Sequence, residues 1–211
     1  MGKALRFQWP ACPITIAFLL SPCASVGKPS GFLSDYSVME EGPCFKQQYA
    51  DPKTDFSRYA KVQVQSVNLQ RFDKQARLNL GKGEPERLAS VLERELRSQL
   101  GGRYRVLASG EVPDKETLIV RPALVYVRTP YRLINVVTTL LILLPVTVGV
   151  AAFEVELADG ATGNKVAQAA EKRTGARDFK SLVIGPFMKY QNAEAIFKIW
   201  SKQLRVFLET K

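Results

Sequence analysis

Residues 153–173 read FEVELADGATGNKVAQAAEKR, and this segment predicts a β-hairpin. Apolar side chains at positions 153, 155 and 157 alternate with Glu154 and Glu156, which is the pattern of a strand with one face in water. Segment 159–164 is rich in turn-forming residues, so residues 165–173 should return as the partner strand. On this interpretation Glu154 and Glu156 are solvated and do not form a catalytic acid pair.

Shorter patterns on the N-terminal side extend the hairpin into a larger sheet. Val62 and Val64 alternate with polar neighbours, as in a half-buried strand. Residues 104–107 and 118–127 are β-like runs separated by a loop that contains glycine and proline. Together with the hairpin, these segments predict five strands.

Two helices are predicted from apolar side chains that recur every three or four residues. The first should begin at Glu84-Pro85 and end at Gly101-Gly102 in a left-handed conformation. The second should begin near Asn192. Its buried face comprises Ala193, Ile196, Phe197, Trp200, Leu204, Phe207 and Leu208. The order β-α-β-β-β-β-α predicts an α+β fold, with two helices packed on one face of a mainly antiparallel sheet.

The N-terminal segment has the pattern of a bacterial export signal that ends at a cysteine. Lys3 and Arg6 precede an apolar run over residues 11–20, which is too short to span a bilayer as a stable helix. The sequence Leu-Ser-Pro-Cys at residues 20–23 stands where a lipoprotein signal is cut. Cys23 is therefore predicted to carry a lipid, which makes membrane lipid the first expected partner.

Alternatives to lipidation stay open. Pro22 occupies a position where lipoprotein sites have a small residue, so an ordinary signal peptide cut near Ala24 or Ser25 also fits. An uncut anchor is disfavoured by the short apolar run. Ala24 is not the aspartate that retains many lipoproteins at the inner membrane, so we expect the lipid-anchored protein on the periplasmic face of the outer membrane. The alternative location is free in the periplasm.

The chain is expected to have three parts. Phe32, Leu33 and Tyr36 are expected to pin an extended N-terminal arm to the folded domain. The predicted boundaries are a signal peptide at 1–22, a lipidated tether and extended arm at 23–58, and a single α+β domain at 59–211 with an apolar insertion at 131–150.

The composition excludes several classes of enzyme. The chain has no histidine, so it cannot hold a Ser-His-Asp or Cys-His site, and it has no Cys/His spacing typical of a metal centre. We predict no cofactor. Of the three cysteines, Cys12 lies in the signal and Cys23 would carry lipid, which leaves Cys44 without an internal partner.

The charge bears on the partners. The net charge is +10, and loss of the signal removes two positive charges and leaves +8. Outside the cytoplasm the abundant anions are lipid head groups and cell-wall polymers, so no nucleic acid is expected as a partner. The alternative is that the basic surface is merely solvated and keeps the protein soluble.

Residues 133–150 form an uncharged run of 18 residues. As a helix this run would be about 27 Å long, barely enough for a bilayer, and Pro145 would kink or break it. A span would also separate strands of one sheet, so two interpretations remain: a buried segment that covers the sheet, or an exposed flap that contacts lipid or an envelope protein. The candidate interaction surface comprises Arg128, Tyr131, Arg132, Leu133, Val137, Leu140, Leu141 and Leu144.

Four segments resemble one family when they are taken in order. They are Gly31-Phe32-Leu33-Ser34-Asp35-Tyr36-Ser37, Phe56-Ser57-Arg58-Tyr59-Ala60-Lys61-Val62, the acidic run at 154–159 with Thr162-Gly163, and Ala195-Ile196-Phe197-Lys198-Ile199-Trp200-Ser201. Over residues 31–208 the chain is similar to the bacterial lipoprotein family called domain of unknown function 3313. The resemblance implies an envelope lipoprotein, and it implies neither a reaction nor catalytic residues.

The sequence therefore predicts a non-enzymatic, lipid-anchored envelope protein that acts as a binding or assembly module. One rival hypothesis is an exported hydrolase that acts on cell-wall or lipid material, which would need a pocket with convergent carboxylates of perturbed pKa. A second rival is a basic nucleic-acid binder in the cytoplasm, which would require the native chain to remain uncleaved there.

Overall fold

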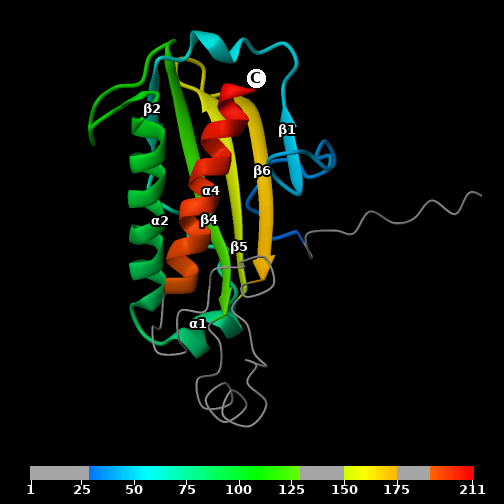
Figure 1. The fold of residues 1–211 in the computed structure, drawn as a ribbon, viewed down its shortest axis with the longest axis vertical. Helices are drawn as coiled ribbons and strands as arrows, with labels where there is room; N and C mark the ends of the chain where they lie inside the picture. The colour runs from blue at the N-terminus through cyan, green and yellow to red at the C-terminus, as the bar shows by residue number, and fades with distance from the viewer. Residues whose placement is uncertain (1–28, 129–149, 175–190) are drawn as a thin grey trace, which may run out of the picture.

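The computed structural model describes residues 29–128, 150–174 and 191–211 (Figure 1). Within these ranges the chain forms one six-stranded sheet, three α-helices and a short 3-10 helix. The strands are β1 (Gln47–Ala50), β2 (Lys61–Val64), β3 (Arg105–Val106), β4 (Thr117–Arg128), β5 (Val150–Asp159) and β6 (Lys165–Thr174). The helices are η1 (Phe56–Arg58), α1 (Lys74–Leu80), α2 (Glu84–Gly101) and α4 (Gln191–Glu209).

The sheet has the strand order β1-β6-β5-β4-β2-β3. Strands β1, β6, β5 and β4 pair antiparallel, whereas β2 runs parallel to both β4 and β3. Parallel neighbours need a long crossover connection, and α1 with α2 provides it between β2 and β3. The predicted α+β fold with a mainly antiparallel sheet is confirmed. The parallel β2 was not expected, because side-chain alternation is the same for both strand directions.

The predicted hairpin is formed by β5 and β6. Phe153 lies opposite Glu171 and Leu157 lies opposite Ala167 in an antiparallel register. The backbone N–H of Asp159 donates to the carbonyl of Asn164 at 2.9 Å and closes the turn. This hairpin, together with the neighbouring strand β4, forms the centre of the sheet.

Helices α2 and α4 lie side by side over one face of the sheet (Figure 1). Trp200 of α4 is fully buried, and its ring stacks on Phe153 with a centroid distance of 5.2 Å. Phe197, one turn earlier, lies 5.7 Å from the same indole ring. The seven predicted apolar positions of α4 are all buried, so the interpretation of Trp200 as a core residue is confirmed.

The helices begin and end close to the predicted residues, but the backbone conformation at the end of α2 differs from the prediction. Helix α2 begins at Glu84 with Pro85 in its first turn, and it ends at Gly101. The expected left-handed end is wrong, because Gly102 has φ −70° and its N–H donates to the carbonyl of Leu100 in a tight right-handed turn. Helix α4 begins at Gln191, one residue before the predicted start.

Three short elements were not predicted, namely β1, the 3-10 helix η1 and α1. Strand β1 lies within the segment expected to be an extended arm, and it pairs with β6 from Gln47 to Ala50. Helix α1 is capped by Asp73, whose carboxylate accepts the N–H of Ala76 at 2.7 Å.

Among the described residues, no helix is long and apolar enough to cross a bilayer.

Candidate functional site

The first part of the candidate site lies on β5, on the face of the sheet opposite α2 and α4, which we call the open face. Because successive strand residues point to opposite faces, Phe153 packs under Trp200 while Glu154 projects from the open face. Glu154 is only 6% exposed. The prediction that Glu154 is solvated is therefore wrong, because the N-terminal arm covers it.

The arm is attached through the carboxylate of Glu154. The hydroxyls of Ser30 and Tyr36 each donate to its Oε2 at 2.7 Å. Leu33, between them in sequence, is buried. We call Ser30, Tyr36 and Glu154 the arm clasp. It confirms, for Tyr36, the expectation that Phe32, Leu33 and Tyr36 pin the arm to the domain.

The same Tyr36 hydroxyl also organises the arm itself. The backbone N–H groups of Gly31, Phe32 and Leu33 donate to it at 3.1, 3.1 and 3.2 Å. This loop requires the left-handed backbone of Gly31, with φ +80°, which other residues adopt only at a cost. One hydroxyl therefore closes the loop and, by donating its proton to Glu154, fixes that loop on the sheet.

A second carboxylate on β5 holds a second segment. Arg58 Nη2 forms an ion pair with Asp159 Oδ2, and the Tyr59 hydroxyl donates to the same oxygen at 3.1 Å. The other oxygen, Oδ1, accepts the backbone N–H of Thr162 and its hydroxyl, both at 2.9 Å. We call Arg58, Tyr59, Asp159 and Thr162 the turn clasp, because it joins η1 to the β5–β6 turn.

The electrostatics of the turn clasp favour a charged aspartate. Burial raises the pKa of Asp159, but hydrogen bonds from Thr162 and Tyr59 and the positive charge of Arg58 outweigh burial and lower it below its ordinary value. Burial also raises the pKa of the Tyr59 phenol, so this group stays protonated and donates. The carboxylate thus remains an acceptor for all of its partners.

A cavity of about 320 Å³ opens beside the arm clasp. Its lining includes three carboxylates, Asp73, Glu154 and Glu171, and two cations, Arg71 and Lys172. Each carboxylate is already bonded to the protein: Asp73 caps α1, Glu154 holds the arm, and Glu171 Oε2 accepts the Lys46 N–H at 2.7 Å. Each of the three therefore has a structural contact within the described residues.

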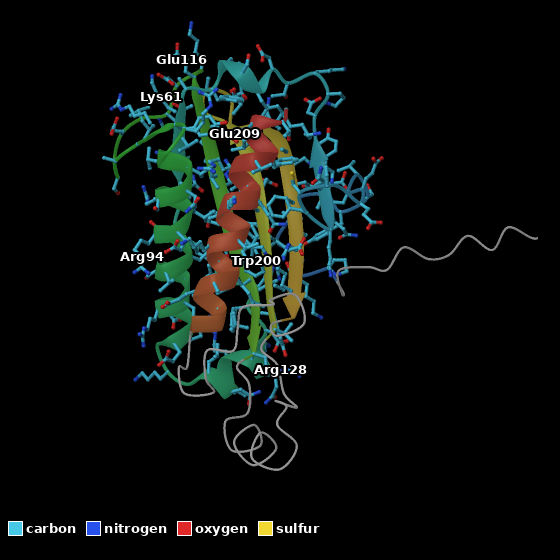
Figure 2. The ribbon with its side chains drawn as sticks, viewed as in Figure 1. Lys61, Arg94, Glu116, Arg128, Trp200 and Glu209 are labelled. Atoms are coloured by element: carbon cyan, nitrogen blue, oxygen red, sulfur yellow. The ribbon has the colours of Figure 1, made fainter. Side chains whose placement is uncertain are left out.

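Of the predicted interaction surface, only Arg128 lies within the described residues. Arg128 is exposed at the end of β4, where Figure 2 labels it. Tyr131, Arg132, Leu133, Val137, Leu140, Leu141 and Leu144 lie outside the described residues, as does the predicted lipid site Cys23. Cys44 is a half-buried free thiol. The described ranges contain no group of three or more metal-ligating side chains.

Several residues of the two clasps had no assigned role from sequence. Ser30 lies in the segment interpreted as tether and extended arm, where no contact was assigned to it, and Asp159 was identified only as part of a turn and of an acidic run. An aspartate at the end of a strand with Thr three residues later is a recognisable turn pattern, because its carboxylate can accept local backbone N–H groups. The bonds from Asp159 to Arg58 and Tyr59 cross about 100 residues of sequence and leave no local signal.

Fold and site together define an α+β domain whose N-terminal arm is bonded to the central part of its sheet. The chain belongs to a family described as "Protein of unknown function (DUF3313)", whose model matches residues 28–204. No curated protein matches the chain.

Two solved structures are distantly similar to this chain. They are the PelC dodecamer from Paraburkholderia phytofirmans and a single-substitution variant of it. Each is 16% identical to this chain, covers 74% of it and has a TM-score of 0.41. The alignments cover 95% and 93% of the PelC and variant chains, respectively.

The segments that resemble the family have one structural property in common, which is contact with the β5 hairpin. Segment 31–37 supplies Tyr36 to Glu154, and segment 56–62 supplies Arg58 and Tyr59 to Asp159. The C-terminal segment supplies Trp200 to Phe153. The scattered motifs therefore describe a single arrangement around β5.

Proposed function

We propose that the protein is a non-enzymatic, lipid-anchored component of the bacterial cell envelope that binds or assembles with a partner at the membrane. The anchor is an acyl group on Cys23, and the location is the periplasmic face of the outer membrane. The observation that carries the proposal is the arm clasp. It fixes Ser30 on the sheet only seven residues after Cys23, so the domain would stay within about 25 Å of an anchored cysteine.

The bonding of the arm supports this proposal because a free exported protein has no evident need for it. Ser30 and Tyr36 tie the arm to a buried carboxylate at the centre of the sheet, not to a surface loop. Such an attachment gives a lipid anchor a fixed exit point from the domain. The domain is then presented to its partner in a limited range of orientations.

The chemistry of the cavity supports a binding role over hydrolysis. An exported hydrolase that uses a carboxylate pair would need both groups available as acid and base. The carboxylates of Asp73, Glu154 and Glu171 each accept hydrogen bonds that maintain the fold. The chain also has no histidine to take either role.

Intact-mass analysis of the protein from the membrane fraction tests the proposal. We expect a mature chain that begins at Cys23 and carries added acyl mass, and we expect this mass to be lost in Cys23→Ala. An unmodified chain cut near Ala24 or Ser25 would contradict the anchor and make the protein a free periplasmic component. Cys44→Ala is the matched control, because Cys44 is a free thiol within the folded part and should not affect processing.

A further inference from the structure

Helix α1 exposes a large apolar side chain between basic residues. Leu78 is 75% exposed, and in the described part of the chain only Val112, at 86%, is another large hydrophobic residue with such exposure. Lys74 lies one helical turn before Leu78, and Lys82 follows four residues after it, just beyond the helix. Residues spaced by four share one side of a helix, so a leucine and at least one lysine face outward together.

The charges around α1 are strongly biased. Residues 71–83 include Arg71, Lys74, Arg77 and Lys82 but only one acid, Asp73, which is engaged as the cap of α1. Arg77 forms an ion pair with Glu86 at 2.7 Å. The other three cations have no ion pair with any residue of the described ranges, so their charge is available to an anionic partner.

Further cations lie at the same end of the sheet. The backbone N–H of Asp73 donates to Val125 near the end of β4, which places α1 beside Arg128 (Figure 2). In the sheet register Arg128 is opposite Val150, at the start of β5. Lys172, on the neighbouring strand, is also exposed. This end of the sheet thus combines an exposed leucine with several positive charges that form no ion pair within the described residues.

The N-terminal arm enters the folded domain next to α1. The Arg71 guanidinium lies 3.8 Å from the position that a Cβ atom on Gly31 would occupy. Pro29, Ser30, Arg71 and Asp73 all line the same cavity. An acyl group on Cys23 would therefore hold the bilayer near α1, since only five residues separate Cys23 from Pro29.

We propose that α1 is a membrane-contact element, in which Leu78 enters the acyl-chain boundary and Arg71, Lys74 and Lys82 bind the phosphates of anionic lipid head groups. Basic residues around an exposed apolar side chain are the usual composition of helices that lie in a membrane interface. The proposal rests on the proposed lipid anchor for the position of the bilayer. The contact would orient the domain with the α1 end towards the membrane.

Tryptophan fluorescence of the exported protein bound to vesicles tests this contact. The vesicles contain phosphatidylethanolamine and phosphatidylglycerol, with a fraction of brominated phosphatidylcholine as quencher. We expect the Leu78→Trp emission to shift to the blue and to be quenched by bromine. Val112→Trp is the matched control, because Val112 lies two residues from Asp114, which bonds Lys61 at the opposite end of the domain (Figure 2). The wild-type signal from the buried Trp200 is subtracted.

The charge requirement is tested in the Leu78→Trp background. Lys74→Glu with Lys82→Glu should abolish the blue shift, whereas Lys115→Glu, an exposed lysine near Val112, should leave it unchanged. Protein that is bound to vesicles but shows equal quenching at positions 78 and 112 would overturn the proposal while the anchor stands. An unacylated protein that still shows selective quenching at position 78 would support the contact and reject the anchor. An unacylated protein without quenching would overturn both.

Discussion

Phe153 and Glu154 are neighbours in β5, yet they serve two faces of the sheet that are organised differently. Phe153 stacks on Trp200 in the core beneath α2 and α4. Glu154 is covered by a short arm and is held by two hydroxyl groups. The helix side is stabilised mainly by buried apolar area, whereas specific hydrogen bonds add to the burial of Leu33 in holding the arm on the open face.

The stability of the whole domain therefore depends on the helix side, whereas the attachment of the arm depends on the arm clasp. Loss of apolar contacts on the helix side should affect the whole domain, because the transition of a small domain is cooperative. Loss of one hydrogen bond in the arm clasp should release only the arm, because local segments can open without global unfolding. The predictions below test this separation, beginning with the largest expected effect.

Trp200→Ala should lower the free energy of unfolding by about 3–5 kcal/mol, because it removes a fully buried ring and leaves a cavity against Phe153. Urea denaturation followed by circular dichroism measures the change. Trp200→Phe is the control, since it keeps an aromatic ring and removes an indole N–H that has no hydrogen-bond partner among the described residues. If both substitutions lowered the free energy of unfolding equally, the loss could not be attributed to the cavity left by removing a buried aromatic ring.

Asp159→Asn should lower the free energy of unfolding by about 2 kcal/mol at pH 7, because it removes the charge that Arg58 and Tyr59 contact in a 3% exposed site. Because the pKa of Asp159 is lowered in the folded protein, the charged form contributes stability above about pH 4. That contribution is lost as the pH falls through the folded pKa. The wild type and Asp159→Asn should therefore converge in stability as the pH falls from about 4 through the lowered pKa of Asp159. A difference that stays constant over this range would exclude the charge as its cause.

Tyr36→Phe should lower the free energy of opening of the arm by about 1–2 kcal/mol without unfolding the domain. It removes the hydroxyl that three backbone N–H groups and Glu154 share as a hydrogen-bond partner. Limited proteolysis with mass spectrometry should show faster cleavage within residues 29–37, with little change in the unfolding midpoint of the domain. Tyr49→Phe is the control, because the Tyr49 hydroxyl has no hydrogen bond within the described ranges. Similar cleavage in both variants would show that the clasp does not hold the arm.

Leu78→Gln should change the free energy of unfolding by no more than about 0.5 kcal/mol, because Leu78 is exposed and glutamine is a good helix former. Leu80→Gln, two residues later in the same helix, should cost more, because Leu80 is buried. Denaturation curves of the two variants give the comparison. A large loss for Leu78→Gln would mean that this leucine contributes to the core and is not a surface residue.

The elements that could be predicted from sequence are those with a long internal period. The hairpin at 153–173, the helix from Glu84 and the C-terminal helix each present several turns or alternations to the core. Strand β2 has only four residues but was detected because its valines alternate with polar neighbours, whereas β1 is half-buried at all four positions and shows no alternation. Helix α1 contains only seven residues, too few to establish a helical period. The direction of β2 was also undetermined, because a parallel pairing depends on the connection and not on the side-chain pattern.

The candidate site shows a further limit of sequence patterns. Alternation correctly placed Glu154 on the face opposite Phe153, but it could not show what covers that face. The partner, Tyr36, lies 118 residues away in the chain, and hydrogen bonds between distant side chains have no period. The expectation that Tyr36 pins the arm was correct, because an aromatic residue in a polar arm usually finds a surface to pack on. Its partner, Glu154, was not predicted.

The position of the arm clasp also determines how the domain would bear mechanical load. Glu154 belongs to β5, which has strands on both sides and lies two strands from the edge formed by β1. A force applied through the arm would first strain the bonds of Ser30 and Tyr36, and it would act on a strand that its neighbours hold on both sides. The arm would detach before the sheet could be peeled from its edge. The arm clasp would therefore break first when the N-terminus is pulled, and the sheet would stay folded.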